Sequence, residues 1–541
     1  RWIHLGNLLP HLYINFLRTV GLDDIVEDEE FDAEPMGKVV PERFRTRILE
    51  HMQTRTEKEW MELFIEGGNI AGHPYQTTQE ALHDPDVTAN GHAVVAHGRR
   101  QLGLSANLTR TPGEIGAPAT DTTLDALGIH TPTAPNAGSA HKLPLEGVTV
   151  VESATIIASP LGASLLADLG ARVIKLEPIT GDPFRSMGAG FGAARCNTGK
   201  ESIALNLKDP KAREIAQTII SKADIFIHNY RPGVPERLGL DYDSLSALNP
   251  GLVYLSVNGY GPNGPGSHRP STHPIPGAAM GGVTYQVGEL PQGELSIDEI
   301  TQVARRLMRA NEVNPDPNTS MMVASAAMMG LAARERGDKA GQLIYLDMFG
   351  ASAYANFDDF LEHPEGSARP QLLDGLYGIH NLHRLYECKE GWVMLALAGN
   401  TDWQQFSALL ENDSLSNIDF ATACQADNVT EVLVSVMTAR TADEWESLCV
   451  PKGIGCVRAD GMLPGEKLYK DTFFHDNALA LPSQHPEFGD ILRHGRVVEL
   501  GDKPDALPGP CALGDSTRSL LAEFGHSEEA VQILFDDGVV G

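Results

Sequence analysis

Four basic residues fall where the strands of a predicted α/β fold end or begin, and they are the first candidates for chemistry. The four are Arg185, Lys200, Arg231 and Arg237. Ser159 can cap a helix and Pro160 suits its first position, so a helix start is predicted beside them. Fixed cations and the free N–H groups of a helix start are what a phosphate-rich ligand requires. The pattern therefore predicts a site for a large anionic ligand.

The elements that must position these residues alternate between short apolar strands and amphipathic helices. Strands of the buried type are predicted at 148–151, 172–177, 202–207, 224–228 and 252–257. The helix after Asp209 is typical, because Asp209 can cap it and Pro210 suits its first position. This alternation predicts a Rossmann-like, doubly wound parallel sheet, an α/β fold that binds ligands at the carboxyl ends of its strands.

The composition restricts the class of partner. The 541 residues include 72 acidic and 42 basic side chains, which gives a net charge of −30. An acidic surface repels phosphate backbones and anionic lipids, so neither nucleic acid nor a membrane is expected as a partner. No run of 18 apolar residues could span a bilayer, and the first residues lack the pattern of a signal peptide. A soluble, cytoplasmic protein is expected.

The six cysteines show neither a CxxC pair nor the spacing of a zinc site. Reduced, packed thiols and no metal are therefore the expectation. A length of 541 residues exceeds what one compact core holds, so two or three domains are expected.

An internal repeat determines the expected domain organisation. Arg55–Thr56 and Trp60 recur at the same spacing as Arg440–Thr441 and Trp445. Each set is followed by a glycine turn, a leucine and a Pro–Gly segment in the same order. Residues 1–135 are therefore interpreted as the C-terminal part of a first copy of one fold. The head of that first copy is expected to lie outside this chain, because of truncation, proteolysis or a separate subunit.

The rest of the chain is interpreted as a complete second copy. Residues 104–142, rich in Thr, Pro, Ala and Gly, are predicted to form a linker whose end is 136–142. A large domain is expected at 143–374 and a smaller α+β domain at 375–480. The C-terminal segment, 481–541, is expected to return to the large domain.

A series of motifs in the second copy carries a family resemblance. They are LPLEGVTVVE, LLADLGARVIKLEP, GDPFR, NTGKESIALNL, ADIFIHNYRPGVPERLGL, LNPGLVYLSVNGYGPNGP and GQLIYLDM. With these motifs, residues 143–541 resemble the class III CoA-transferases, the formyl-CoA and carnitine-CoA type, over nearly their whole length. The resemblance implies an enzyme that moves CoA between carboxylic acids, with coenzyme A or acyl-CoA as substrate and no metal.

The same resemblance implies an architecture and a binding site. The family pairs a Rossmann-like large domain with a small domain, and two protomers interlock as rings. A fused tandem member is implied here, which would form a homodimer or a complex with the missing N-terminal part. The CoA contacts implied by the family motifs are Ile156, Ile157, Ala158, Arg185, Lys200, Asn229, Tyr230 and Arg231.

The chain departs from the resemblance at the nucleophile. The family is expected to place a catalytic Asp in a Tyr-Asp step shortly after the NGYGPNGP-like motif, where it attacks the thioester and carries CoA. Here His273 and Pro274 occupy those two positions, and proline cannot be a nucleophile. The related α-methylacyl-CoA racemases keep a His there and pair it with an Asp ahead of an Arg-x-Arg stretch. Asp316 falls close to that position, so His273 and Asp316 are a candidate acid–base pair.

Three hypotheses about function follow. The first is a CoA-transferase whose working Asp lies in the missing head or in a partner protomer. The second is an α-methylacyl-CoA racemase or isomerase that moves an α-proton with His273 and Asp316. The third is a non-catalytic acyl-CoA-binding half of a fused transferase, in which Asp316 is only a turn residue of its NPDPN segment.

Overall fold

The computed structural model describes the chain except residues 34–39, 118–120, 122–142, 311–312, 367–368, 411, 413, 416 and 500–502. The predicted linker end, 136–142, lies outside the described residues. The chain divides into two compact units. The large unit is Arg1–Thr284, Pro291–Ser367 and Phe473–Gly541, and the small unit is Tyr285–Leu290 and Ala368–Thr472.

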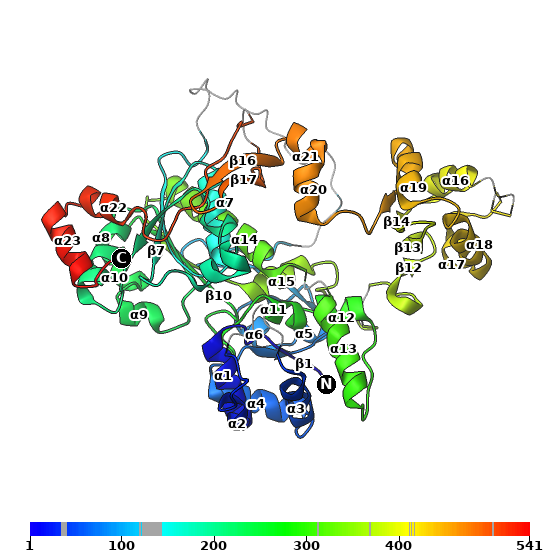
Figure 1. Cartoon of the computed structure of the whole chain (residues 1–541), viewed down its shortest axis with the longest axis horizontal. Coiled ribbons are helices and arrows are strands. Elements are labelled where there is room, and N and C mark those ends of the chain that lie inside the picture. The colour runs from blue at the N-terminus through cyan, green and yellow to red at the C-terminus, as the bar shows by residue number, and fades with distance from the viewer. Residues whose placement is uncertain are drawn as a thin grey trace. The chain divides into compact units, whose positions relative to one another are not determined.

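Within the described residues, a seven-stranded sheet forms the centre of the large unit (Figure 1). Its strands, in spatial order, are β5 (Ala106–Leu108), β11 (Gln342–Asp347), β10 (Val253–Asn258), β9 (Ile225–His228), β6 (Thr149–Ser153), β7 (Arg172–Glu177) and β8 (Lys200–Ala204). Strand β5 pairs antiparallel with β11, and every other pair is parallel. The predicted α/β class with a mostly parallel sheet is confirmed.

Helices cover both faces of this sheet, which is why its strands are apolar on both sides (Figure 1). Val151 and Ile174 pack towards α8, α10, α22 and α23. Val150 and Val173, one residue earlier in each strand, pack towards α7 and α14 on the other face. The helices of this part are α7 (Ala158–Asp168), α8 (Pro210–Ile220), α9 (Val234–Leu238), α10 (Tyr242–Leu248), α11 (Pro274–Ala279), α12 (Gly282–Val287), α13 (Ile297–Arg309), α14 (Pro315–Arg336), α15 (Met348–Ala355), α21 (Thr472–Asp476), α22 (Thr517–Glu523) and α23 (Glu528–Asp536).

Shorter elements complete the rims of the large unit. The hairpin β16 (Ala480–His485) and β17 (Gly489–His494) is antiparallel. Three short 3-10 helices follow β7 in the chain: η2 (Pro183–Ser186), η3 (Gly188–Gly190) and η4 (Arg195–Asn197). They lie in the connection from β7 to β8.

The first 117 residues, here called the front segment, fold as part of the large unit. Strand β5 adds to the central sheet through the register Ile344↔Leu108. This differs from the predicted linker at 104–142, because the backbone of a three-residue strand pairs with β11 without any apolar pattern of its own. The other elements of this segment are β1 (Ile3–Leu5), α1 (Pro10–Val20), α2 (Asp23–Val26), α3 (Glu42–Met52), α4 (Glu57–Gly67), β2 (Gly72–Pro74), α5 (Thr78–Ala81), α6 (Pro85–Ala89), β3 (Ala93–Ala96) and β4 (Arg99–Leu102).

The front segment is attached to the sheet by a buried ion pair. His92 Nε2 lies 2.7 Å from Asp347 Oδ2, and both side chains are almost fully buried. Although burial acts to lower the pKa of His92, the neighbouring carboxylate of Asp347 raises it above the ordinary value. A protonated His92 is therefore favoured, because it leaves Asp347 paired inside the protein.

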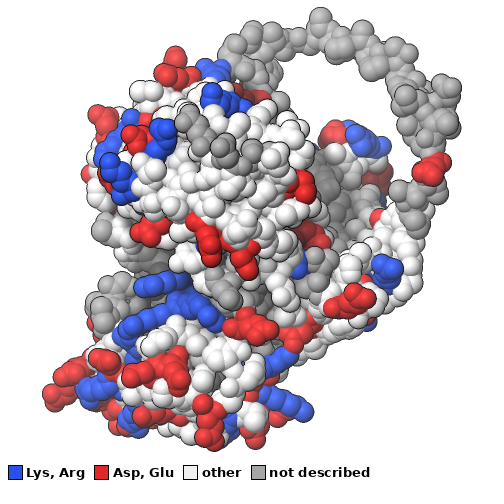
Figure 2. All heavy atoms as spheres, turned by 90° about the vertical axis from the view of Figure 1, so that its right-hand side faces the viewer, with Lys and Arg blue, Asp and Glu red and all other residues white. Residues whose placement is uncertain are grey.

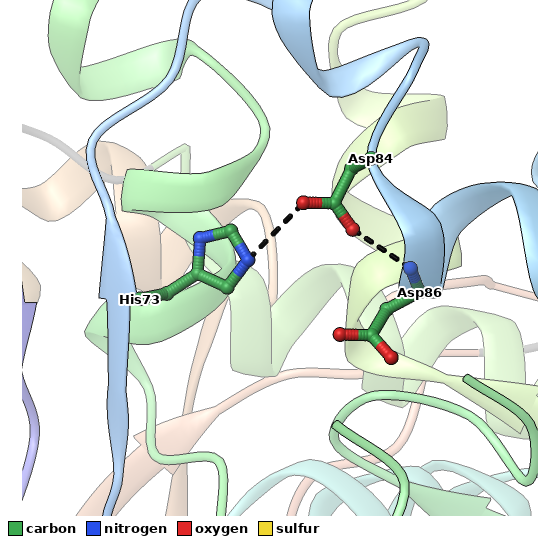
Figure 3. A group of neighbouring side chains, drawn as sticks. All are labelled: His73, Asp84 and Asp86. Carbon is green, nitrogen blue, oxygen red and sulfur yellow. Dashed lines mark hydrogen bonds and ion pairs between the residues drawn. The ribbon is translucent and has the colours of Figure 1, made fainter. Parts of the chain in front are cut away.

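A second buried polar cluster joins the front segment to the loop after β10 (Figure 3). His73 Nε2 lies 3.3 Å from Asp84 Oδ2, and Asp84 Oδ1 accepts the backbone N–H of Asp86 at 2.9 Å. The backbone N–H of Gly266 donates to Asp86 Oδ1 at 2.7 Å, and Arg269 is close enough to act on the charge of Asp86. Ligand atoms of the His and the two Asp lie within 4.8 Å of one another, but hydrogen bonds already occupy both oxygens of Asp84. We interpret the cluster as a salt-bridged contact.

Burial raises the pKa of Asp86 to about 6, and this predicts a pH-dependent stability. A raised folded-state pKa means that the contribution of Asp86 to stability is complete below about pH 4 and is lost as the pH rises through 6. Asp86→Asn keeps an oxygen for the Gly266 N–H without the charge. It should therefore gain stability over the natural protein between pH 4 and pH 7, by on the order of 1–3 kcal/mol.

Thermal unfolding of both proteins from pH 4 to pH 8 checks this expectation. The matched control is Asp298→Asn, since Asp298 is an exposed carboxylate on α13. The control should follow the natural protein at every pH. A stability difference for Asp86→Asn that stays constant with pH would show that Asp86 titrates as an ordinary carboxylate.

The small unit has its own sheet and its own core. Its antiparallel strands are β12 (Gly378–His380), β13 (His383–Glu387), β14 (Trp392–Ala396) and β15 (Cys456–Arg458). Trp403, Phe406 and Trp445 are buried at its centre. Its helices are α16 (Asn400–Leu409), α17 (Phe420–Gln425), α18 (Asp427–Met437), α19 (Ala442–Cys449) and α20 (Pro464–Lys470), with the 3-10 helices η5 (Asp374–Leu376) and η6 (Val450–Lys452).

The front segment and the small unit share local geometry. Helices α4 and α19 both start with a threonine that forms a capping box. The indole of Trp60 donates to the carbonyl of Met52 at 2.8 Å, and the indole of Trp445 donates to the carbonyl of Met437 at 2.9 Å. The pairing of β1 with β2 matches that of β14 with β15, since both pairs are antiparallel. In each pair, one strand lies before the capped helix in the chain and the other lies after it. The two segments therefore fold in the same way over these elements.

The apolar range 321–333 lies within α14, but it is not buried on every side. Met321, Met328 and Met329 are 42%, 38% and 46% exposed, because only one side of α14 packs on α7 and the sheet. In the described part of the chain, no helix is long and apolar enough to cross a membrane. Figure 2 shows acidic and basic side chains mixed over one face, with one group of Lys and Arg side chains among them.

Candidate active site

The two residues singled out as an acid–base pair lie in direct contact. His273 is the residue before α11, and Asp316 lies in the first turn of α14. The distance between His273 Nδ1 and Asp316 Oδ2 is 2.7 Å. The side chain of His273 is 34% exposed and that of Asp316 is 7% exposed. The pair therefore has one solvent-accessible member and one shielded carboxylate.

The start of α14 is attached to the start of α7. The hydroxyl of Ser320 lies 2.7 Å from the carbonyl oxygens of both Asp316 and Ala158. The helices also pack closely, because a Cβ on Gly162 would lie 2.7 Å from atoms of Val323. Asp316 is therefore held beside the amino end of α7, where backbone N–H groups have no acceptor within the helix.

The turn before α7 carries three of the predicted CoA contacts. Ile156 has a φ of +72°, and its N–H donates to both carboxylate oxygens of Asp182 at 3.1 Å. Ile157 and Ala158 follow at the amino end of α7. Ile156 and Ile157 are half-buried and Ala158 is buried. A ligand at this turn would meet backbone as well as side chains.

The loop after β9 is attached to that turn. The amide oxygen of Asn229 accepts the N–H of Thr155 at 3.1 Å, and its amide nitrogen donates to the carbonyl of Thr155 at 2.9 Å. The hydroxyls of Tyr230 and Ser153 lie 2.6 Å apart. Because β6 and β9 are neighbours in the sheet, their loops meet at one edge, as the sequence predicted.

Arg231 is a cation without a carboxylate partner among the described residues. It donates to the side-chain oxygen of Asn69 and to the carbonyl of His268, both at 3.1 Å. Burial lowers the pKa of Arg231 from its ordinary value. An anionic group of a ligand would supply the negatively charged partner for this guanidinium.

Two of the predicted cations are already paired, which corrects the expectation of free charges in loops. Lys200 is the first residue of β8, its side chain is 0% exposed, and it bonds Glu152 and the carbonyl of Pro160 at 2.7 Å. Arg185, in η2, holds Glu177 through two bonds of 2.8 and 2.5 Å. Sequence spacing does not show the Lys200 pair, because Glu152 lies on β6, which β7 separates from β8 in the sheet. Glu177 precedes Arg185 by eight positions, at the end of β7.

Arg237 differs from both. It lies in α9, not in a loop, and it is exposed. Its guanidinium lies near Gly233, in the loop that carries Arg231, since an added Cβ on that glycine would be 3.8 Å from Arg237 Nη1. Arg231 and Arg237 are therefore the predicted cations that the structure leaves available for a ligand.

The front segment supplies neighbours of the site that the sequence did not indicate. Thr272, next to His273, donates to the carbonyl of Gly6 at 2.8 Å. A Cβ on Gly6 would collide with that hydroxyl. Together with Asn69 beside Arg231, this contact brings residues more than 150 positions away in sequence next to the site. No local pattern signals such contacts.

The comparisons with known proteins agree on one family. The sequence profile described as CoA-transferase family III matches residues 1–122 and 145–515. The beta subunit of succinyl-CoA–L-malate CoA-transferase from Chloroflexus aurantiacus is 40% identical over 430 residues, which is 74% of this chain and 100% of that protein. The succinyl-CoA–D-citramalate CoA-transferase of the same organism is 37% identical over 411 residues, 72% of this chain and 96% of that protein. The mouse succinyl-CoA:glutarate CoA-transferase is 27% identical over 412 residues, 73% of this chain and 90% of that protein.

Solved structures support the fold. A Mycobacterium tuberculosis protein matches with a TM-score of 0.57 at 21% identity and covers 70% of this chain and 99% of its own. A CAIB/BAIF family protein from Brucella suis matches with a TM-score of 0.54 at 22% identity, covering 71% of this chain and 100% of its own. At this level of identity the likeness concerns the fold alone.

Proposed function

Because the chain belongs to CoA-transferase family III and moves CoA between carboxylic acids, we propose that Asp316 is the carboxylate that carries this transfer. The observation that supports it is the position of Asp316, shielded at the start of α14, in contact with His273 and beside the amino end of α7. The expected Tyr-Asp position offers only His273 and Pro274. Asp316 needs no missing head or partner to supply the nucleophile, unlike the first of the three hypotheses.

The proposed reaction balances with one carboxylate. Asp316 attacks the thioester carbonyl of the donor, the C–S bond breaks, and a mixed anhydride and CoA thiolate form. The thiolate then attacks the Asp316 carbonyl, which gives an aspartyl thioester and releases the donor acid. The acceptor carboxylate repeats both steps in reverse, so that acceptor-CoA leaves and Asp316 is restored. His273 donates its Nδ1–H to Asp316 and so orients the attacking oxygen.

The substrate class is proposed from the relatives. The names of the 40% and 37% identical proteins pair succinyl-CoA with L-malate and with D-citramalate. Succinate, malate and citramalate are all dicarboxylic acids. We infer that a dicarboxylic acyl-CoA is the donor here, and succinyl-CoA with L-malate is the first pair to assay. All six cysteines are free thiols, which supports a reducing compartment such as the cytoplasm.

CoA is proposed to bind along the edge formed by the turn before α7 and the loop after β9. Ile156, Ile157 and Ala158 would contact it on one side, and Asn229, Tyr230 and Arg231 on the other. Arg237 would add charge. Arg185 and Lys200 are proposed to act by holding the strand ends, since their own charges are paired.

Arg231→Ala should weaken CoA binding by about 1.5–3 kcal/mol, the usual value of a hydrogen bond to a charged group. The affinity of the natural protein should also fall as salt rises, and less steeply in the variant. Titration calorimetry with CoA measures both. The control is Arg305→Ala, which removes an exposed arginine of α13. An unchanged affinity in Arg231→Ala would remove this residue from the site.

The tandem arrangement is also proposed. The equal geometry of α4 and α19, and of the strand pairs beside them, supports the interpretation of the front segment as the tail of a first copy. In the front segment these elements pack within the large unit, where His73 of β2 is buried. At the matching position of β15, Val457 is 44% exposed. The small unit is therefore proposed to dock on a second large domain, in a homodimer or with the missing head, as interlocked copies would.

Association of the purified chain checks this proposal. Light scattering coupled to gel filtration should give a mass of at least twice 58.4 kDa, or a complex with an added head fragment. Val457→Glu should shift the equilibrium towards the monomer, because a charge would be buried in the new contact. A monomer at every concentration, in the presence of the head fragment, would contradict it.

The alternative of α-proton transfer keeps one specific observation in its favour. The 2.7 Å contact between His273 and Asp316 is also what an acid–base pair requires. The absence of both CoA transfer and α-proton exchange would favour the third hypothesis, a non-catalytic acyl-CoA-binding half.

A further inference from the structure

Four charged side chains form a buried network under the turn that precedes α7. They are Glu152, Lys175, Asp182 and Lys200, and none of these side chains is more than 2% exposed. Lys175 Nζ lies 3.0 Å from Glu152 Oε1 and 3.2 Å from Asp182 Oδ2. Lys200 bonds the other oxygen of Glu152. Two ammonium groups thus face two carboxylates, so the network is neutral without any ligand.

This network contacts the backbone of the turn at three points. Lys175 donates to the carbonyl of Ala154 at 3.0 Å, and Lys200 donates to the carbonyl of Pro160 at 2.7 Å. Between them, Asp182 accepts the N–H of Ile156 through both oxygens. The buried charges therefore hold the backbone at Ala154, at Ile156 in the turn and at Pro160 in the first turn of α7.

The middle of the turn has a conformation that its residue disfavours. Ile156 has a φ of +72°, which a β-branched side chain rarely adopts. Such a conformation persists only where the surroundings impose it. The hydrogen bonds from the Ile156 N–H to Asp182 are the contacts that do so, and Lys175 fixes the carboxylate that receives them.

We propose that Asp182, held by Lys175, is a positioning residue for CoA transfer: it keeps Ile156 in the left-handed conformation and so aims the amino end of α7 at the thioester beside Asp316. This role rests on the proposed CoA site. It differs from that proposal because Asp182 is buried and acts through the turn, without touching the substrate.

A double-mutant cycle tests this role. Asp182→Ala removes the acceptor of the Ile156 N–H and should raise the KM for acyl-CoA by about tenfold or more. Glycine adopts a positive φ without strain. Ile156→Gly should weaken acyl-CoA binding by the natural protein, because the proposed side-chain contact of Ile156 is lost. In the Asp182→Ala background the same substitution should restore part of the binding, with a coupling of about tenfold. A general loss of stability in Asp182→Ala would not be relieved by a glycine 26 positions earlier in the sequence, so the recovery is specific.

One further variant and the CoA affinity of the natural protein complete the test. Asp182→Asn retains one acceptor oxygen for the Ile156 N–H, so its KM should lie between those of the natural protein and Asp182→Ala. It replaces Asp182→Ala in the cycle if the alanine variant does not fold. Additive effects of the two substitutions, with normal CoA affinity in the natural protein, would overturn the positioning role alone. Undetectable CoA binding by the natural protein would instead contradict the proposed CoA site.

Discussion

Replacement of Asp316 by asparagine should lower the rate of CoA transfer by about 10³-fold or more, since an amide is not a nucleophile for a thioester. Asparagine has nearly the same shape and can still bond His273, so the fold should be kept. The rate is measured as the formation of acceptor-CoA from succinyl-CoA and L-malate by chromatography. CoA affinity, measured separately, should change little.

The control for Asp316→Asn is again Asp298→Asn, on the exposed face of α13. It should retain full activity. Transfer by Asp316→Asn at more than about a tenth of the natural rate would exclude a covalent role for this carboxylate, given the 10³-fold loss expected. The nucleophile would then have to be another residue of this chain or come from a partner.

Replacement of His273 by alanine should have the second largest effect, a loss of about 10²-fold in transfer, because the attacking oxygen of Asp316 is no longer oriented. Asparagine at this position has an amide nitrogen close to the place of Nδ1. His273→Asn should therefore recover part of the rate. Equal rates for the alanine and asparagine variants would contradict an orienting role of the Nδ1–H group.

Heavy water distinguishes this role from α-proton transfer. If His273 and Asp316 were an acid–base pair, the protein would exchange the α-proton of a 2-methylacyl-CoA for deuterium. His273→Ala would then lower the exchange by about 10²–10⁴-fold. The transferase account expects no exchange above the solvent rate, which mass spectrometry of the recovered thioester measures.

The parallel sheet was predictable because its signal is local. Strands β6, β9 and β10 are short, largely apolar runs, whereas β7 also contains Arg172, Lys175 and Glu177. All four are largely buried, and each is followed by a turn or a helix start. The cap Asp209 was also visible, since a capping residue and the helix it starts are neighbours in sequence. Strand β5 gave no such signal, because three residues pair across more than 230 positions with β11.

The site was predictable only in part. The contact of His273 with Asp316 followed from a family resemblance, not from spacing. The role proposed for Asp316 has no such signal, because the family motif places the nucleophile at the position of Pro274. Lys200 looked like a ligand-binding cation, yet it neutralises Glu152 inside the protein. Such pairing depends on which strands are neighbours, and a single sequence does not state that order.

The most direct test of the account is to find where the enzyme carries the transferred group. The natural protein is incubated with succinyl-CoA, treated with hydroxylamine, digested and mapped by mass spectrometry. An aspartyl thioester at Asp316 would be converted to a hydroxamate in the peptide that starts α14, and Asp316→Asn should lack it. Residues 268–282, around His273, should remain unmodified. A hydroxamate elsewhere, or none while transfer proceeds, would contradict the proposal that Asp316 carries CoA.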